Sequence, residues 1–153
     1  MRGIRATPVE VPLNFVLGTA SGIFRQAPLL LVDVETEEGI TGRSYLFCYM
    51  PAVAAAVASL LGEVARISKG DTVEPEALWA KLMRRFTLIG VQGVVRMAVA
   101  GFDTACWDAL GQAAQQPLCR LLGAEPRPIP AYNSCGLGLM DDLGLLAAEA
   151  ETL

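Results

Sequence analysis

Side chains that could carry acid–base or nucleophilic chemistry are scarce in this chain of 153 residues. There is no histidine, and the two lysines, Lys69 and Lys81, fall in a region whose pattern predicts helices. Ser134 and Cys135 therefore lack the histidine partner that activates a nucleophile in the common triads. The sequence predicts no catalytic residue set within this chain.

The carboxylates are spread along the chain rather than gathered at metal-ligand spacing. Two pairs of neighbours fall in a predicted turn and a predicted loop, where we expect solvated surface: Glu37–Glu38 and Asp141–Asp142. Asp103 and Asp108 lie five positions apart on a predicted helix, which does not put them on one face. We expect these two carboxylates to pair with nearby arginine side chains, and we expect no metal ligands in this chain.

Composition limits the class of protein and its partners. Hydrophobic residues make up 53% of the chain and the net charge is −4, which favours a folded globular protein. The twelve Lys and Arg residues form no cluster beyond Arg84 and Arg85. We therefore expect neither nucleic acid nor an acidic membrane surface as a partner.

The cysteines and the N-terminus bear on cellular location. The four cysteines lie far apart without a CxxC pair, which favours reduced thiols: Cys48, Cys106, Cys119 and Cys135. The N-terminal residues lack the apolar region and cleavage site of a signal peptide. The longest weakly polar run, residues 52–61, is too short to span a bilayer. These features predict a soluble, cytoplasmic protein.

The first third of the chain has the pattern of an antiparallel sheet. Residues 4–11, 28–36 and 41–48 are predicted strands, with a turn at residues 37–40. Pro8 and Pro12 restrict the first strand to an edge of the sheet or to its own ends. Residues 14–25, with the small residues GTASG, are predicted to form a mobile loop between the first two strands.

Helices follow the strands. Residues 52–67, 75–86 and 94–111 are predicted helices, and the last is apolar around most of its circumference, so it needs cover from more than one element. This order favours an α+β domain in which helices cover one face of an antiparallel sheet. A helical turn at 117–123, a proline-rich connector, a strand at 129–134 and a helix from residue 143 to 153 then predict the opening unit of a second, α/β domain.

Five segments in register resemble one known family. They are TASGIFRQAPLLLVDVETEEGITG at 19–42, RSYLFCYMP at 43–51, RRFTLIGVQGVVRMAVAGFDTACWDALG at 84–111, PLCRLLG at 117–123 and PIPAYNS at 128–134. In order and spacing the chain is similar to the mandelate racemase and muconate lactonizing enzyme group of the enolase superfamily. Mandelate racemase-like members and acid-sugar dehydratases are the nearest in pattern.

The resemblance implies a two-part architecture. Residues 1–123 would form the N-terminal capping domain, a three-stranded antiparallel sheet plus helices. Residues 128–153 would form the first strand and helix of an incomplete (β/α)₈ barrel, since a whole barrel needs about 250 residues. The chain therefore resembles the N-terminal fragment of a longer enzyme.

The resemblance also implies a reaction and a cofactor. Enzymes of this superfamily remove the proton next to a carboxylate with metal assistance, as racemases or as acid-sugar dehydratases. We expect Mg²⁺ in the complete enzyme, with its ligands outside this chain. The implied partners are a small carboxylate substrate, either a 2-hydroxy acid or an acid sugar, the chain's own missing barrel, and further copies in a homo-oligomer.

The residues that set substrate specificity in the family can be matched by position to residues of this chain. The loop between the first two strands closes over the barrel mouth in the family, which makes Leu17, Thr19, Ile23 and Phe24 candidate substrate contacts. Two further positions match in the same way: Tyr49 resembles a tyrosine near the substrate, and Ser134 resembles a serine at the end of the first barrel strand. Packing between domains is the alternative role for Phe24 and Tyr49.

Two other readings stay open. The chain could be a stand-alone binding or interaction module that resembles the capping domain and has no catalysis of its own. It could also be an unrelated small α+β ligand-binding domain, which requires the five matching segments to be coincidental. We expect the first reading, a racemase- or dehydratase-like N-terminal fragment, to hold.

Overall fold

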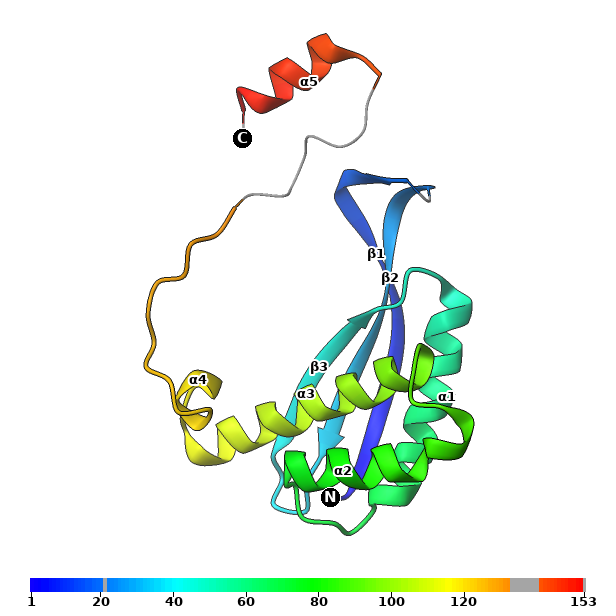
Figure 1. Cartoon of the computed structure of the whole chain (residues 1–153), viewed down its shortest axis with the longest axis vertical. Helices are drawn as coiled ribbons and strands as arrows, with labels where there is room; N and C mark the ends of the chain where they lie inside the picture. Colours follow the sequence, from blue (N-terminus) through cyan, green and yellow to red (C-terminus); the bar gives the residue numbers. More distant parts are fainter. Residues whose placement is uncertain (21, 133–140, 153) are drawn as a thin grey trace. The chain divides into compact units, whose positions relative to one another are not determined.

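The computed structural model describes residues 1–20, 22–132 and 141–152. Figure 1 shows the order of elements along the chain. They are β1 (Gly3–Thr19), β2 (Gly22–Glu35), β3 (Thr41–Phe47), α1 (Pro51–Ser68), α2 (Pro75–Arg85), the 3₁₀ turn η1 (Thr87–Ile89), α3 (Val94–Ala114), α4 (Leu118–Leu121) and α5 (Leu143–Ala150).

The three strands form one antiparallel sheet in the order β1-β2-β3. The β2–β3 pairing places Leu30 opposite Leu46 and Asp33 opposite Arg43. Leu30, Val32 and Val34 alternate with more exposed residues along β2 and are fully buried, so one face of the sheet carries the core. The predicted sheet is confirmed, and β1 lies at an edge, as its prolines indicated.

The helices α1, α2 and α3 lie on one face of this sheet (Figure 1). α3 packs against β3, α1 and α2. The buried residues of α3 recur at helical spacing and include Ala98, Val99, Phe102, Ala105 and Cys106. They join the buried strand residues in one core, together with side chains of α1 and α2. The predicted α+β arrangement is confirmed.

α1 is the most apolar of the long helices. Among the helices that the structure describes, it alone is long and apolar enough to cross a membrane, and 28% of its 18-residue window is buried. Its buried residues Ala54, Val57, Leu61 and Val64 lie three or four positions apart and belong to the core. This spacing is that of a helix that packs one stripe against a protein interior.

Residues 14–19 and 22–25 are strand rather than the expected loop, because β1 continues to Thr19 and β2 begins at Gly22. Gly22 has a φ of 149°, which glycine adopts freely, and the Thr19 hydroxyl donates to the Gly22 carbonyl at 3.0 Å. The prediction was wrong because β-branched and aromatic residues flank the small GTASG motif, and these favour extended backbone.

The C-terminal elements match the predictions in part. Residues 129–132 are not in a strand, while the rest of the expected strand lies outside the described residues. An extended segment becomes a strand only when it pairs, and Pro128 and Pro130 cannot donate backbone hydrogen bonds. α5 begins at Leu143 as expected. Asp142 caps it by accepting from the backbone N–H groups of Gly144 and Leu145, so this carboxylate does more than face solvent.

The contacts divide the chain into two compact units. The first comprises residues 1–9 and 28–126 and contains the core. The second comprises residues 10–27 and 127–153. Each unit is described by itself below.

Candidate functional site

The four candidate substrate contacts predicted between the first two strands lie on the hairpin formed by β1 and β2. Leu17 and Thr19 are on β1, and Ile23 and Phe24 are on β2. Leu17 is 41% exposed and Ile23 is 69% exposed, so both apolar side chains are available for contact. Thr19 uses its hydroxyl within the turn, on the Gly22 carbonyl.

Strand geometry separates these four residues into two sets. Leu17 and Thr19 are two positions apart on one strand, so their side chains share a face. Ile23 and Phe24 are neighbours on β2, so their side chains point to opposite faces. One face of the hairpin therefore carries Leu17, Thr19 and either Ile23 or Phe24. The other of these two β2 residues lies on the opposite face.

Tyr49 has the most unusual backbone among the predicted site residues. It lies two residues after the end of β3, has a φ of 60°, and is spanned by a hydrogen bond from the Met50 N–H to the Cys48 carbonyl at 2.7 Å. A non-glycine residue in such a turn is strained. The residue is 55% exposed, and its ring lies 4.3 Å from the Phe47 ring, centroid to centroid.

The remaining predicted site residue, Ser134, lies outside the described residues, as does Cys135. The hairpin candidates belong to the second unit and Tyr49 belongs to the first. The structure thus groups Leu17, Thr19, Ile23 and Phe24 on one hairpin and describes Tyr49 separately.

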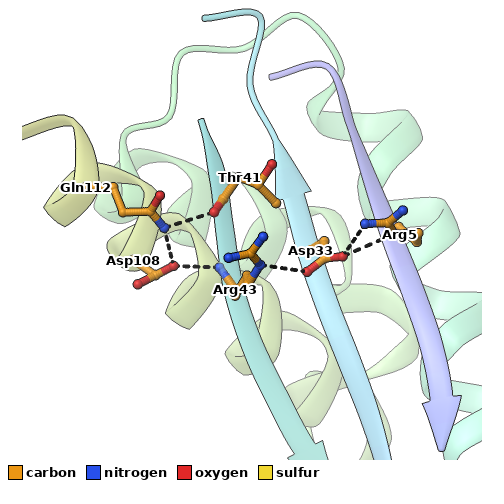
Figure 2. A network of polar contacts seen from close by, with 6 residues as sticks. All are labelled: Arg5, Asp33, Thr41, Arg43, Asp108 and Gln112. Carbon is orange, nitrogen blue, oxygen red and sulfur yellow. Dashed lines mark hydrogen bonds and ion pairs between the residues drawn. The ribbon is translucent and has the colours of Figure 1, made fainter. Parts of the chain in front are cut away.

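A polar network crosses the face of the sheet that points away from the core (Figure 2). Asp33 at its centre accepts from Arg5, with the Nη2–Oδ2 distance at 2.6 Å, and pairs with the Arg43 guanidinium at 3.7 Å. The hydrogen bond with Asp33 raises the pKa of Arg5. The row Arg5–Asp33–Arg43 joins all three strands.

The network continues from the sheet to α3 (Figure 2). Asp108 accepts from the Arg43 backbone N–H at 2.7 Å and from the Gln112 amide at 2.7 Å. The same Gln112 amide donates to the Thr41 carbonyl at 2.9 Å. In the described sheet β3 pairs with β2 along one edge, so the backbone groups on its other edge have no strand partner. Asp108 and Gln112 of α3 hydrogen-bond to two of these groups.

The expected arginine partners of the two helix carboxylates are not found. Asp108 binds the backbone N–H of Arg43, because the guanidinium of that residue turns to Asp33. Asp103 forms no ion pair with an arginine in the described part of the chain, and burial raises the pKa of its carboxyl. Both expectations were wrong. The spacing of residues along α3 alone does not show that β3 and α2 lie beside these carboxylates.

Metal and nucleophile chemistry find no support in the described residues. No three Cys, Asp or Glu side chains there come together as a metal site. Glu38 is engaged within its own turn, where backbone and Thr36 hydrogen bonds lower its pKa. Cys48 and Cys106 are buried, and burial raises the pKa of Cys106 to about 12, so its thiol stays protonated and unreactive. These residues do not fit a bound magnesium ion.

A cavity between α2 and α3 was not predicted from the sequence. It has a volume of about 290 Å³ and is lined by Glu76 and Trp79 of α2 and Asp103 and Trp107 of α3. Glu76 and Trp79 are three positions apart and Asp103 and Trp107 are four apart, so each pair shares a helix face. An acid three or four positions before a tryptophan on each of two predicted helices was the available signal, but nothing in the sequence shows that the two helices face each other.

Comparison with known proteins identifies relatives for most of the chain. Residues 1–123 match the model of the mandelate racemase / muconate lactonizing enzyme N-terminal domain. The arabinonate dehydratase of Saccharolobus solfataricus is 29% identical over 110 residues, which is 71% of this chain and 29% of that enzyme.

Solved structures give the same relationship. An enolase from Bradyrhizobium, complexed with magnesium and mandelic acid, is 42% identical with a TM-score of 0.81, over 86% of this chain and 36% of that one. An enolase from alpha proteobacterium bal199 with bound magnesium is 36% identical with a TM-score of 0.92, over 99% of this chain and 42% of that one. The chain thus spans less than half the length of each of these relatives.

Proposed function

The chain belongs to the mandelate racemase and muconate lactonizing enzyme family, and from this premise we propose that it is the N-terminal part of an enzyme that abstracts the proton next to a carboxylate. The observation that carries the proposal is the match of residues 1–123 to the family's N-terminal domain. The capping domain shapes the site in this role, and the catalytic groups lie elsewhere in the complete protein.

The substrate class follows from the relatives. One curated relative is an arabinonate dehydratase, and one structural relative was solved with mandelic acid and magnesium. A sugar acid and mandelic acid share a hydroxyl on the carbon next to the carboxylate. We therefore propose a 2-hydroxy acid or an acid sugar as substrate, with racemisation or dehydration as the reaction.

The chain's own contribution is specificity. Leu17, Ile23 and Phe24 supply apolar surface on the hairpin, and Tyr49 supplies a hydroxyl from a strained turn. Apolar contacts with a few placed polar groups are typical of sites for small molecules. Mg²⁺ in the complete enzyme supplies charge stabilisation, and its ligands come from outside the residues described here.

The competing function is a stand-alone binding module without catalysis. Its support is that the core lies entirely within residues 1–126, so the capping domain has its own interior. The two functions differ in what the gene encodes after Leu153. A reading frame that continues into strands ending in carboxylates, with a Lys-x-Lys strand, supports the enzyme, and a stop codon there supports the module.

The decisive assay follows exchange of the proton next to the carboxylate. The full-length protein is incubated in D₂O with Mg²⁺ and either mandelate or a panel of sugar acids, and loss of the corresponding proton signal is measured by NMR. We expect magnesium-dependent exchange for at least one substrate. Removal of Mg²⁺ by EDTA is the matched control, and absence of exchange across both substrate classes would reject the enzyme.

A further inference from the structure

The cavity between α2 and α3 combines aromatic rings with unpaired acids. Trp79 and Trp107 line it together with Glu76 and Asp103, in a volume of about 290 Å³. Asp103 and Trp107 are half-buried, while Glu76 lies at the exposed side. All four residues belong to the first compact unit, so their arrangement does not depend on the hairpin or the C-terminal segment.

The carboxylates of this cavity have no counter-charge within the described chain. Neither Glu76 nor Asp103 takes part in any of the ion pairs formed by the described residues. Burial alone raises the pKa of Asp103, because no charged or hydrogen-bonding partner offsets the loss of solvent. A positive charge in the cavity would supply the missing partner.

The tryptophans add attraction for a cation. An indole face carries negative electrostatic potential and binds ammonium and guanidinium groups. Trp79 already does so within the chain, since the Arg96 guanidinium carbon lies 5.2 Å from its ring centroid. Arg96 contacts Trp79 but does not line the cavity, so no cation of the chain lies among the lining residues beside Trp107 and the two carboxylates.

This combination selects one class of cation. Mg²⁺ and Ca²⁺ prefer six or more oxygen ligands, whereas two of the four lining side chains are indoles. An alkylammonium group suits the cavity better, because its methyl or methylene groups contact the rings while its charge faces the carboxylates. We propose that Glu76, Trp79, Asp103 and Trp107 form a binding site for a small alkylammonium ligand.

The site is separate from the residues of the proposed function. None of the hairpin residues or Tyr49 lines this cavity, and the ligand's charge is opposite to that of a carboxylate substrate. The proposal therefore stands or fails independently of the enzymatic reaction.

The chain provides its own reporter for a binding test. It contains two tryptophans, and both line this cavity. Intrinsic fluorescence of the 153-residue chain is therefore titrated with choline. The neutral carbon analogue 3,3-dimethylbutan-1-ol is titrated in parallel, and NaCl is added to match ionic strength. We expect a saturable fluorescence change with choline and none with the alcohol or with NaCl.

Substitutions then test the named side chains. Asp103→Asn and Glu76→Gln should each weaken choline binding at least about threefold, because each removes a charge that faces the cation. Glu76 is exposed, so its substitution leaves the core intact even where Asp103→Asn disturbs folding. Glu63→Gln is the matched control, since Glu63 on α1 pairs with Arg66 and does not line the cavity.

Three results would overturn the proposal. The first is no saturable response to choline. The second is an equal response to the neutral alcohol, which would indicate apolar contact without charge recognition. The third is an unchanged choline affinity in Glu76→Gln and in a folded Asp103→Asn variant.

Discussion

Tyr49 shows how a single residue can be held against its own conformational preference. Its φ of 60° costs about 1 kcal/mol or more relative to glycine, since an L side chain crowds its backbone there. The turn is fixed on both sides, by the Cys48 N–H bound to the Pro28 carbonyl and by Pro51 at the start of α1. Such strain, retained at an exposed aromatic residue, is typical of positions kept for a function.

The role of Tyr49 can be tested in the complete enzyme. We expect Tyr49→Phe to lower kcat/KM at least about tenfold, because the proposed role of the hydroxyl is to contact a polar group of the substrate. The unfolding free energy should change by no more than about 1 kcal/mol, the usual cost of one hydrogen bond. Steady-state kinetics and urea denaturation measure the two effects.

Tyr45→Phe is the control for this experiment, because Tyr45 is also an exposed tyrosine but lies within β3, on the face of the sheet away from the core. It should leave both quantities unchanged. If Tyr49→Phe leaves kcat/KM unaltered and lowers the denaturation midpoint, Tyr49 contributes to packing and not to substrate binding.

The buried thiols give a second prediction at this scale. Burial raises the pKa of Cys106 to about 12 in the folded chain, above its unfolded value of about 8.5. The folded state therefore keeps a proton that the unfolded state loses, and stability should fall as pH rises from about 8.5 towards 12. Urea denaturation across this range should show a shallower fall for Cys106→Ala than for the unchanged chain, and parallel curves would contradict the assignment.

At the scale of elements, the contact between β3 and α3 depends on two glycines. A Cβ on Gly42 would overlap the backbone carbonyl of Ala105 and lie 2.8 Å from the Cβ of Ala109. A Cβ on Gly101 would instead meet the end of the Leu46 side chain at 2.8 Å. A side chain can rotate away, whereas the backbone of a packed helix cannot, so the two glycines differ in what they tolerate.

This difference predicts unequal costs for two similar substitutions. Gly42→Ala should lower the unfolding free energy by about 3 kcal/mol, because α3 must move away from the sheet. Gly101→Ala should cost less than about 1 kcal/mol, since alanine's higher helix propensity offsets the shift of Leu46. Chemical denaturation of both variants measures this, and equal losses would show that the close approach is not fixed by the backbone.

The β1–β2 hairpin yields a prediction about local stability. Val16, Leu17 and Ile23 are exposed, so this part of the hairpin has little apolar burial to hold its strands together. We expect amide hydrogens of residues 14–25 to exchange faster than those of α3, which carries much of the core. Hydrogen exchange followed by mass spectrometry measures both segments, and equal protection would contradict the assignment of the hairpin as a closing element.

The sequence predicted those elements in which buried residues recur at a regular spacing along the chain. The alternation in β2 and the helical spacing in α3 are set by which face meets the core, so both are readable without the structure. The hairpin was missed because GTASG has the composition of a loop, although its flanks favour strands. The φ of Tyr49 and the cavity between α2 and α3 depend on which elements meet in three dimensions, and a linear pattern does not encode that.

At the scale of the whole molecule, the core lies within the first compact unit, and the described residues include no group of three Cys, Asp or Glu side chains that could hold a metal ion. Lys81, one of its two lysines, donates to the Asp71 carboxylate and to the Ile67 carbonyl, so it is engaged in holding α2 to the end of α1. The chain also covers only 36% of its Bradyrhizobium relative. We propose that folding of the capping domain and the chemistry of the reaction belong to different parts of the complete protein.

This separation predicts that the 153-residue chain alone does not exchange the proton next to the carboxylate of mandelate or a sugar acid. The described residues provide neither a magnesium site nor a base placed beside one. NMR in D₂O with Mg²⁺ measures the exchange against a buffer control. Magnesium-dependent exchange above that control would show that this chain carries catalytic groups.

The hydrogen bonds from α3 to β3 have a consequence for how the protein behaves among other chains. Asp108 and Gln112 occupy the Arg43 N–H and the Thr41 carbonyl on one outer edge of the sheet. At the other edge, Pro8 and Pro12 have no N–H to offer. A strand from a neighbouring molecule therefore finds no continuous row of partners on either side, and the three-stranded sheet resists growth into fibrils and edge-to-edge aggregates.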